Sequence, residues 1–260
     1  QNRLVQQTDA RSGNHAYSYD EVGNLLVWTD ARGSATHYGY DELNRLSSIT
    51  DALEGVHRFE HDAVGNTVAM TDANGQTTLR VYDALNHPVQ RTDALGGTER
   101  FAYDAFGNLQ AWTDARGNTT QYAYDALDQQ ISITDALSGV TSFGYDPAGY
   151  MTSVTDPNGH TTAYAYDALH RLVRRTDPLA GVRSLTYDAV GNMASQQDEN
   201  GHVTRYQYDG LHRLVALTDA MGGITAWAYD AVGNPVALTD ANGHTTRFEY
   251  DELDRLVRQL

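Results

Sequence analysis

The chain has 260 residues and no cysteine, and its 18 basic and 34 acidic side chains give it a formal charge of −16. The missing cysteines exclude disulfides and thiolate metal sites, and the acidic balance argues against a nucleic-acid partner, which requires clustered Lys and Arg. No run of 18 apolar residues is present, so we predict no membrane span, and residues 1–5 do not resemble a signal peptide.

Two dipeptides recur along the chain with a period of 21 residues. The first is Tyr-Asp, which begins at Tyr19-Asp20 and has His61-Asp62 in one of its slots. The second is Thr-Asp, which begins at Thr8-Asp9 and departs from the pattern at Gln197-Asp198. Together they supply 24 of the 34 acidic residues, so the negative charge is mainly a property of the repeat.

The stretch before each Tyr-Asp pair has the alternation of a β-strand. An aromatic residue stands two positions before the Tyr slot in ten of twelve units, as Tyr17 does before Tyr19, with Arg80 and Leu185 as the exceptions. Side chains alternate across a strand, so both rings of a pair lie on one face. We interpret them as ring-on-ring packing between neighbouring repeats, with sugar binding as the alternative.

Each Tyr-Asp segment predicts a reverse turn. Four residues after the Tyr slot the units alternate between Gly and a set of Asn, Asp and His, which makes a 42-residue superperiod of residues that tolerate positive φ. The residue three after the slot is apolar, as in Val22 and Leu43, and we expect its burial to anchor the turn. The two classes are Gly23, Gly65, Gly107, Gly149, Gly191 and Gly233, and Asn44, Asn86, Asp128, His170, His212 and Asp254.

A second alternating stretch, as in Leu26 and Trp28, leads to each Thr-Asp pair, where glycine again predicts a turn with positive φ. One class of turn has this glycine four residues after the Thr slot, and the other has it five residues after. The two classes are Gly33, Gly75, Gly117, Gly159, Gly201 and Gly243, and Gly13, Gly55, Gly97, Gly139, Gly181 and Gly223.

The turn residues offer little for chemistry. Each turn supplies one or two carboxylate oxygens, whereas calcium takes six to eight, so we expect the Asp side chains to accept backbone N–H groups in Asx turns. The histidines lack ligand spacing, and His160, His202 and His244 are interpreted as turn residues. No nucleophile, phosphate-loop or dinucleotide motif is present, and almost every residue has counterparts in the other repeats. We therefore predict no catalytic, cofactor-binding or metal-binding residues and no cofactor.

No residue type recurs with the 3.6-residue period of a helix. Each unit is expected to form two strands of six to eight residues, which gives roughly 24 strands in an antiparallel meander that strand twist forces to coil. The predicted fold is all-β, with tandem 21-residue β-hairpin repeats over residues 1–260 forming a coiled, solenoid-like antiparallel sheet. Its terminal strands would be unpaired, which predicts edge-to-edge self-association.

The segment Tyr208-Asp209-Gly210-Leu211-His212-Arg213-Leu214 and residues 240–251 resemble the YD-repeat, or rearrangement-hotspot (Rhs), family. The resemblance covers essentially the whole chain, with twelve motifs in phase. The family includes Rhs polymorphic toxins, the C components of insecticidal toxin complexes and the teneurins. It implies a segment of a hollow β-shell, cut from a longer protein, that encloses a C-terminal toxin domain absent from this chain.

The resemblance also implies the chain's surroundings. The expected partners are other parts of the same shell, an encapsulated toxin domain and components of a secretion apparatus, with no nucleic acid and no membrane span. The expected location is outside the cell or on its surface, in a bacterium, and the expected role is structural and not enzymatic. The alternative is a carbohydrate-binding or cell-adhesion repeat module.

Overall fold

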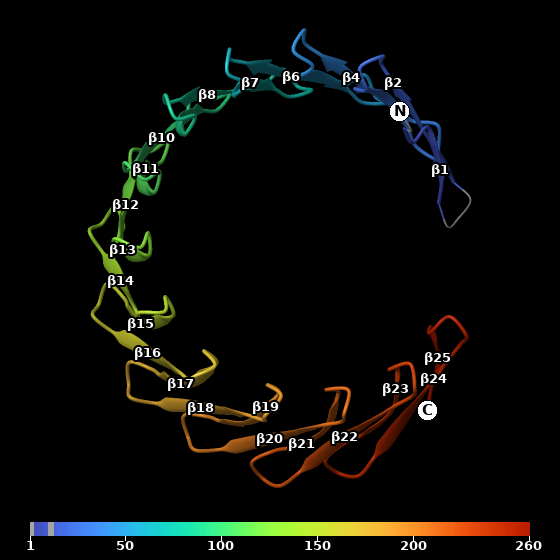
Figure 1. Cartoon of the computed structure of the whole chain (residues 1–260), viewed down its shortest axis with the longest axis vertical. Helices are drawn as coiled ribbons and strands as arrows, with labels where there is room; N and C mark the ends of the chain where they lie inside the picture. Colours follow the sequence, from blue (N-terminus) through green and yellow to red (C-terminus); the bar gives the residue numbers. More distant parts are fainter. Residues whose placement is uncertain (1–2, 10–12) are drawn as a thin grey trace. The chain divides into compact units, whose positions relative to one another are not determined.

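The computed structural model describes residues 3–9 and 13–260, and this part of the chain forms 25 strands and no helix (Figure 1). The all-β prediction is therefore confirmed, while residues 1–2 and 10–12 of the expected array lie outside the described residues. The chain divides into two compact units, Gln1–Ser138 and Gly139–Leu260.

The strands of the first unit are β1 (Gln6–Thr8), β2 (Asn14–Tyr19), β3 (Leu25–Thr29), β4 (Ala35–Tyr40), β5 (Leu46–Thr50), β6 (Val56–His61), β7 (Thr67–Thr71), β8 (Thr77–Tyr82), β9 (Pro88–Thr92), β10 (Thr98–Tyr103), β11 (Leu109–Thr113), β12 (Thr119–Tyr124) and β13 (Gln130–Thr134). Those of the second unit are β14 (Val140–Tyr145), β15 (Met151–Thr155), β16 (Thr161–Tyr166), β17 (Leu172–Thr176), β18 (Val182–Tyr187), β19 (Met193–Gln197), β20 (Val203–Tyr208), β21 (Leu214–Thr218), β22 (Ile224–Tyr229), β23 (Pro235–Thr239), β24 (Thr245–Tyr250) and β25 (Leu256–Gln259).

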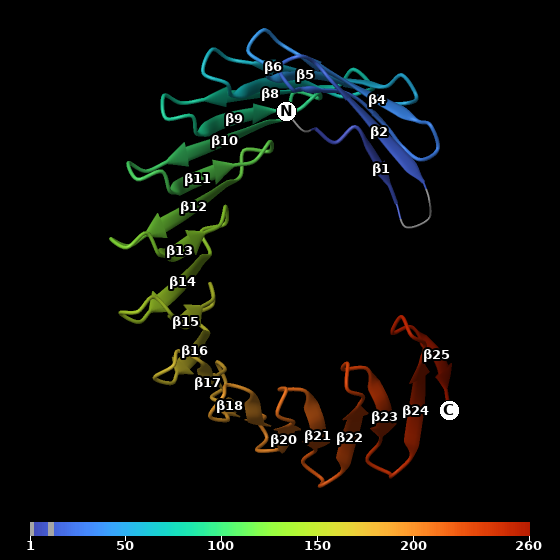
Figure 2. The ribbon, with the colours of Figure 1, turned by 45° about the vertical axis from the view of Figure 1, so that its right-hand side comes forward.

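Within each unit the strands form an antiparallel meander, in which every strand pairs with the next one along the chain (Figure 2). Between the short β1 and β25, strands of six and five residues alternate, so one set lies at the lower limit of the six to eight residues expected and the other is one residue shorter. The reason lies in the turns. Each turn occupies five residues, as in 41–45 and 51–55, and two such turns leave only eleven residues of a 21-residue repeat for its two strands.

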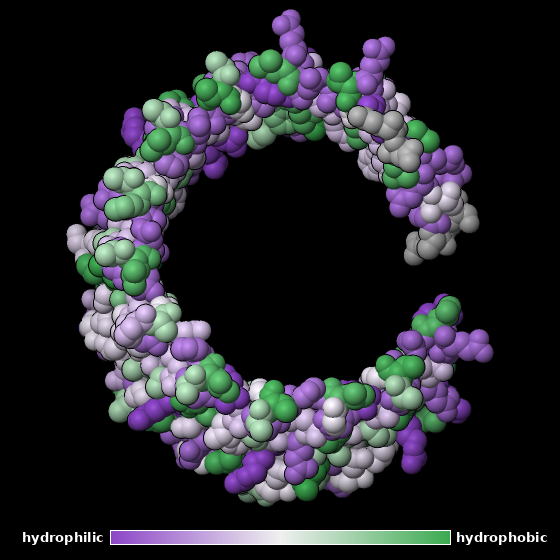
Figure 3. Space-filling model, viewed as in Figure 1, coloured by the Kyte–Doolittle hydropathy of each residue, from purple (hydrophilic) through white to green (hydrophobic). Residues whose placement is uncertain are grey.

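The sheet is a single layer without a core. Ala69, which is 6% exposed, is the only buried hydrophobic side chain among the described residues. On the side of each unit that Figure 3 shows, hydrophobic and hydrophilic residues are interspersed. Strand pairing and side-chain hydrogen bonds must therefore hold the repeats together, because no second layer covers either face.

The aromatic residues share one face of the sheet, as predicted. Tyr17 lies opposite Trp28, while the intervening Ser18 lies opposite Val27 on the other face. The expected continuous ring-on-ring stacking is wrong, because equivalent rings of successive repeats are two strands apart. That separation is about 9.6 Å, whereas ring centroids in contact lie within about 7 Å. Between them lie residues without rings, such as Ile49 opposite Tyr38.

Every strand that ends in the Tyr slot leaves its ladder through a β-bulge. In β2 and β3, Ser18 lies opposite Val27, but Tyr19 lies opposite Leu25, so Leu26 is the extra residue. On its other side β3 pairs with β4 only from Val27 onward. The carbonyl group of Leu25 therefore lies beyond the ladder and needs another donor.

Candidate functional site: the two turn edges

The turns at the end of the sheet that carries the Tyr-Asp dipeptides, here called the Tyr-Asp edge, share a positive φ at their fourth residue. In the turn that begins at Asp41, the N–H of Asn44 donates to the carbonyl of Asp41 (3.0 Å), and the N–H of Asp41 donates to the carbonyl of Arg45 (2.9 Å). Asn44 has a φ of 60°, which completes a type I turn followed by a left-handed residue. The positive φ predicted for the Gly, Asn, Asp and His class is confirmed.

The Asp side chain caps this turn. Oδ1 of Asp41 accepts hydrogen bonds from the N–H groups of Leu43 and Arg45, each at 2.9 Å. These backbone hydrogen bonds, that of Arg45 first, together with the Arg45 guanidinium, lower the pKa of Asp41 against an opposing partial desolvation. The Asx turn expected from the sequence is confirmed, and it recurs in both kinds of turn. One carboxylate oxygen is thus already saturated by the turn itself.

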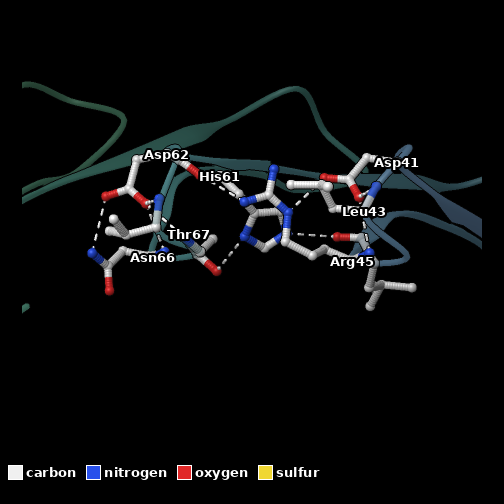
Figure 4. A network of polar contacts seen from close by, with 10 residues as sticks. Asp41, Leu43, Arg45, His61, Asp62, Asn66 and Thr67 are labelled. Atoms are coloured by element: carbon white, nitrogen blue, oxygen red, sulfur yellow. Dashed lines mark hydrogen bonds and ion pairs between the residues drawn. The ribbon is translucent and has the colours of Figure 1, made fainter.

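The last residue of most turns on the Tyr-Asp edge ties that turn to its neighbour, as Arg45 and Asn66 do (Figure 4). Arg45 donates from Nε to Oδ2 of Asp41 (2.7 Å) and from Nη1 to the carbonyl of Asp62 in the next turn (2.6 Å). Asn66 donates from Nδ2 to Oδ2 of Asp62 (2.9 Å) and to Oδ1 of Asn86 in the turn after that (2.8 Å). The 42-residue superperiod therefore reflects two alternating braces.

The arginine brace also covers a tyrosine ring. The guanidinium carbons of Arg171 and Arg213 lie 4.6 and 4.7 Å from the ring centroids of Tyr187 and Tyr229. Tyr150 replaces the usual Asn, and its ring stacks on His170 at 4.5 Å instead of donating a hydrogen bond. The sequence interpretation missed this position as a brace, although its alternation of Asn and Arg was the available signal.

Tyrosine hydroxyls supply the donors that the bulges require. The hydroxyl of Tyr40 donates to the carbonyl of Leu25 at 3.0 Å, and burial raises the pKa of this phenol. In the Tyr slot at His61, Nε2 lies 2.9 Å from the carbonyl of Leu46, so the imidazole takes the same place. The same contact is made by Tyr19, Tyr82, Tyr103, Tyr124, Tyr166, Tyr187, Tyr229 and Tyr250.

The strands, the capped turns and the row of tyrosine hydroxyl hydrogen bonds, here called the hydroxyl seam, recur along the chain. The RHS Repeat family model matches residues 19–55, 61–98, 103–140, 124–161, 145–182, 187–224 and 229–260. The chain belongs to the RHS repeat family. The family predicted from the Tyr-Asp motifs is thus confirmed.

Several solved structures have a similar fold. The crystal structure of TcdB2-TccC3-TEV matches 95% of this chain with a TM-score of 0.55 and 16% identity. A structure of the Photorhabdus luminescens Tc holotoxin pore matches 99% with a TM-score of 0.54 and 16% identity. This chain spans 17% of the length of either chain, and identity this low establishes the shared fold alone. No curated protein sequence matches the chain.

The opposite edge of the Rhs repeats carries the Thr-Asp turns, and here it is called the Thr-Asp edge. The hydroxyl groups of Thr71 and Thr77 lie 2.8 Å apart across one such turn, which accounts for the threonine of the dipeptide. Asp and Thr together close this end of the hairpin in the same way in both units.

The glycines five residues after the Thr slot serve a different purpose from the one predicted. Positive φ falls on the preceding residue, as at Glu54 (φ 63°), and Gly55 has none. A Cβ on Gly55 would lie 2.7 Å from Oδ2 of Asp51 and 3.1 Å from Cβ of Ala73. Close approach, and not backbone conformation, thus requires glycine here. The prediction is also wrong for Gly13, Gly97, Gly181 and Gly223, which have no positive φ and on which a Cβ would lie 2.5–2.7 Å from the Asp Oδ2 of the same turn.

The apolar residues at the turn tips of the Rhs repeats are exposed, so the expected buried anchors are wrong. Leu43 is 65% exposed and Val64 is 75% exposed. Each donates its backbone N–H to the Asp carboxylate of its own turn. We define the Tyr-Asp tip row as Val22, Leu43, Val64, Leu85, Phe106 and Leu127 in the first unit, and Leu169, Val190, Leu211, Val232 and Leu253 in the second.

The histidines after the turn glycines hydrogen-bond within their own turns. Nδ1 of His160, His202 and His244 lies 3.0–3.3 Å from the Asp carboxylate four residues earlier. In residues 3–9 and 13–260, no three potential metal ligands gather in one place. Within the same ranges there is no helix with the length and apolar character needed to cross a membrane.

Proposed function

We propose that this chain is a wall segment of an encapsulating shell, in which residues 1–260 act as one array within a longer protein. The observation that carries the proposal is a single-layer sheet whose hairpins are braced to their neighbours at the Tyr-Asp edge and whose turns are capped by Asp carboxylates. Such a sheet separates two compartments without a second layer. In this proposal, the repeated residues hold the wall together.

The finer proposal concerns what the wall encloses. The similar folds belong to structures of TcdB2-TccC3 and of a Tc holotoxin pore. We propose a corresponding setting for this chain: an exported bacterial toxin or surface protein, with the rest of the shell and a C-terminal toxin domain as its partners.

We further propose that the wall is not catalytic. A turn carboxylate such as Asp41 accepts two backbone N–H groups through one oxygen and a guanidinium through the other, so both oxygens are engaged. The same contacts recur at Asp167 and Asp209. Groups that are repeated and internally paired suit a structural role better than a single reactive centre.

Protease protection in the full-length natural protein tests the enclosing role. The segment that follows the array is digested in the full-length protein and, as a control, as a separately expressed fragment. We expect much slower cleavage within the full-length protein. Equal cleavage rates would refute enclosure. Oligosaccharide binding by this chain, with quenching of the fluorescence of Trp28, Trp112 and Trp227, would instead support the carbohydrate-binding alternative.

A further inference from the structure

We infer that the two turn edges dock onto a second copy of the array, with the Thr-Asp edge of one copy lying against the Tyr-Asp tip row of the other. The docking residues on the Thr-Asp edge, here called the Thr-Asp tip row, are Leu53, Leu95 and Leu137 in the first unit and Leu179 and Met221 in the second. Docking of this kind does not depend on whether the shell encloses a cargo.

The Thr-Asp tip row contains the most exposed large apolar side chains of the chain as described. Leu53 is 91% exposed, Leu95 is 96% exposed and Met221 is 93% exposed. A soluble surface seldom keeps such side chains in a regular series unless something covers them. The tips therefore mark an interaction surface.

The turn itself does not require an apolar tip, as the alternate turns of the same edge show. Asn74 holds the equivalent position, and its N–H donates to the carboxylate of Asp72 at 2.9 Å. Leu53 makes the same contact with Asp51 at 2.8 Å. The backbone geometry is thus equal with a polar or an apolar tip, so the leucine is explained by what it meets outside the hairpin.

The spacing of the tips identifies the partner. Neighbouring strands lie about 4.8 Å apart, so successive Tyr-Asp tips are about 10 Å apart and successive Thr-Asp apolar tips are about 19 Å apart. A partner that contacts every tip must present matching sites at the same interval. A second stretch of this array has that interval, because its own tips repeat every 21 and every 42 residues.

Pairing of unlike edges covers both apolar rows. Each Thr-Asp tip would lie between two consecutive Tyr-Asp tips, with the polar tips such as Arg32 and Asn74 over the next gap. If like edges paired, the pair would be closed, and the other row of each copy would remain exposed to solvent. The unlike arrangement is open-ended, since a pair keeps one free edge of each kind to which further copies can add, so that both rows of every inner copy are covered.

Sedimentation of the 260-residue chain tests this docking. In the test variant, Leu53, Leu95, Leu137, Leu179 and Met221 are all replaced by Gln. In the matched control, the same change is made at five of the polar tips, Arg32, Asn74, Arg116, Asn158 and Asn200. Circular dichroism checks that both variants keep the strand content of the wild type.

We expect the wild type and the control to self-associate, and the test variant to require at least about a tenfold higher concentration, which corresponds to losing the burial of one leucine. Unchanged association of the test variant would overturn the inference, as would a wild type that stays monomeric. If instead Val257→Pro in β25 abolishes association and the tip variant does not, strand-end pairing is the cause and tip docking is wrong.

Disulfide trapping tests which edges meet, because the chain contains no cysteine. Leu95→Cys places a thiol on the Thr-Asp edge, and Leu85→Cys places one on the Tyr-Asp edge. The two variants, tagged to differ in size, are mixed and oxidised. We expect the mixed disulfide to exceed its random share, and a random distribution would refute the unlike pairing. Protease protection of a cargo can succeed or fail independently of either result.

Discussion

Removing two tyrosine hydroxyls from the first unit should measure what the seam contributes to stability. The double variant Tyr40→Phe with Tyr124→Phe deletes the hydrogen bonds to the carbonyl groups of Leu25 (3.0 Å) and Leu109 (3.1 Å). Each carbonyl lies at a bulge, beyond the ladder of its strand, so no backbone N–H replaces the lost donor. The rings remain and continue to fill the same space.

The expected loss follows from the partial burial of these bonds. A hydrogen bond of this kind contributes about 0.5–1.5 kcal/mol, so two contribute about 1–3 kcal/mol to the free energy of unfolding. Water can reach part of each carbonyl, which favours the lower half of that range. For a chain of this size, about 1–2 kcal/mol corresponds to a fall in melting temperature of roughly 2–8 °C.

The matched control is Tyr38→Phe with Tyr122→Phe. These residues lie on the same strands, β4 and β12, two positions earlier, and their hydroxyls make no hydrogen bond within the described residues. Thermal unfolding followed by circular dichroism compares the two double variants. The reasoning is refuted if both lower the melting temperature equally, or if neither does.

Three further results are expected from the turns. In the folded chain the carboxylates of Asp41, Asp167 and Asp209 have pKa values below the usual 3.8, so their stabilisation is complete above that pH and declines as the pH falls below it. Urea unfolding from neutral pH to about pH 2 should show this loss, and greater stability in acid would contradict it. Glu54→Gly should raise the free energy of unfolding by about 0.5–1 kcal/mol, because glycine adopts positive φ without strain. Gly55→Ala should lower it by about 1–3 kcal/mol, because the added Cβ clashes with the Asp51 carboxylate; thermal melts giving the opposite order would disprove the assignment of positive φ to Glu54 and of close approach to Gly55. Arg213→Gln should lower the free energy of unfolding by about 1 kcal/mol, because Arg213 also contacts the next turn. Arg255→Gln, at a side chain that is 71% exposed, should change it by less than about 0.5 kcal/mol; equal losses in urea titrations would contradict the bracing role of Arg213.

The periodic features of the fold were predictable from sequence because the same 21-residue pattern occurs twelve times. Alternation around Tyr17 and Tyr19 identified the strands and their shared face, and the small residues after Asp20 and Asp41 identified the turns. The Asx cap followed from the chemistry of a carboxylate beside free N–H groups. Local rules sufficed wherever the deciding contact lies within one hairpin.

Contacts between hairpins were harder to predict. The brace from Arg45 to Asp62 spans two turns, and no local rule says which carbonyl a long side chain will reach. Leu43 was predicted to be buried because apolar side chains usually pack in a core, but a single-layer sheet provides no core for it to pack against. Gly55 was assigned a positive φ by analogy with Gly33, although the distinguishing approach of Ala73 comes from the following turn.

The short reach of the side-chain hydrogen bonds has a consequence for how such a chain can change length. The brace from Asn66 to Asn86, with 20 residues between its ends, is among the longest of them, so each repeat depends only on its immediate neighbours. Unequal crossing-over between two similar 42-residue stretches would delete or duplicate a pair of hairpins and keep the repeat in phase. The number of hairpins can therefore change from one generation to another, whereas most proteins would not tolerate such a deletion or duplication.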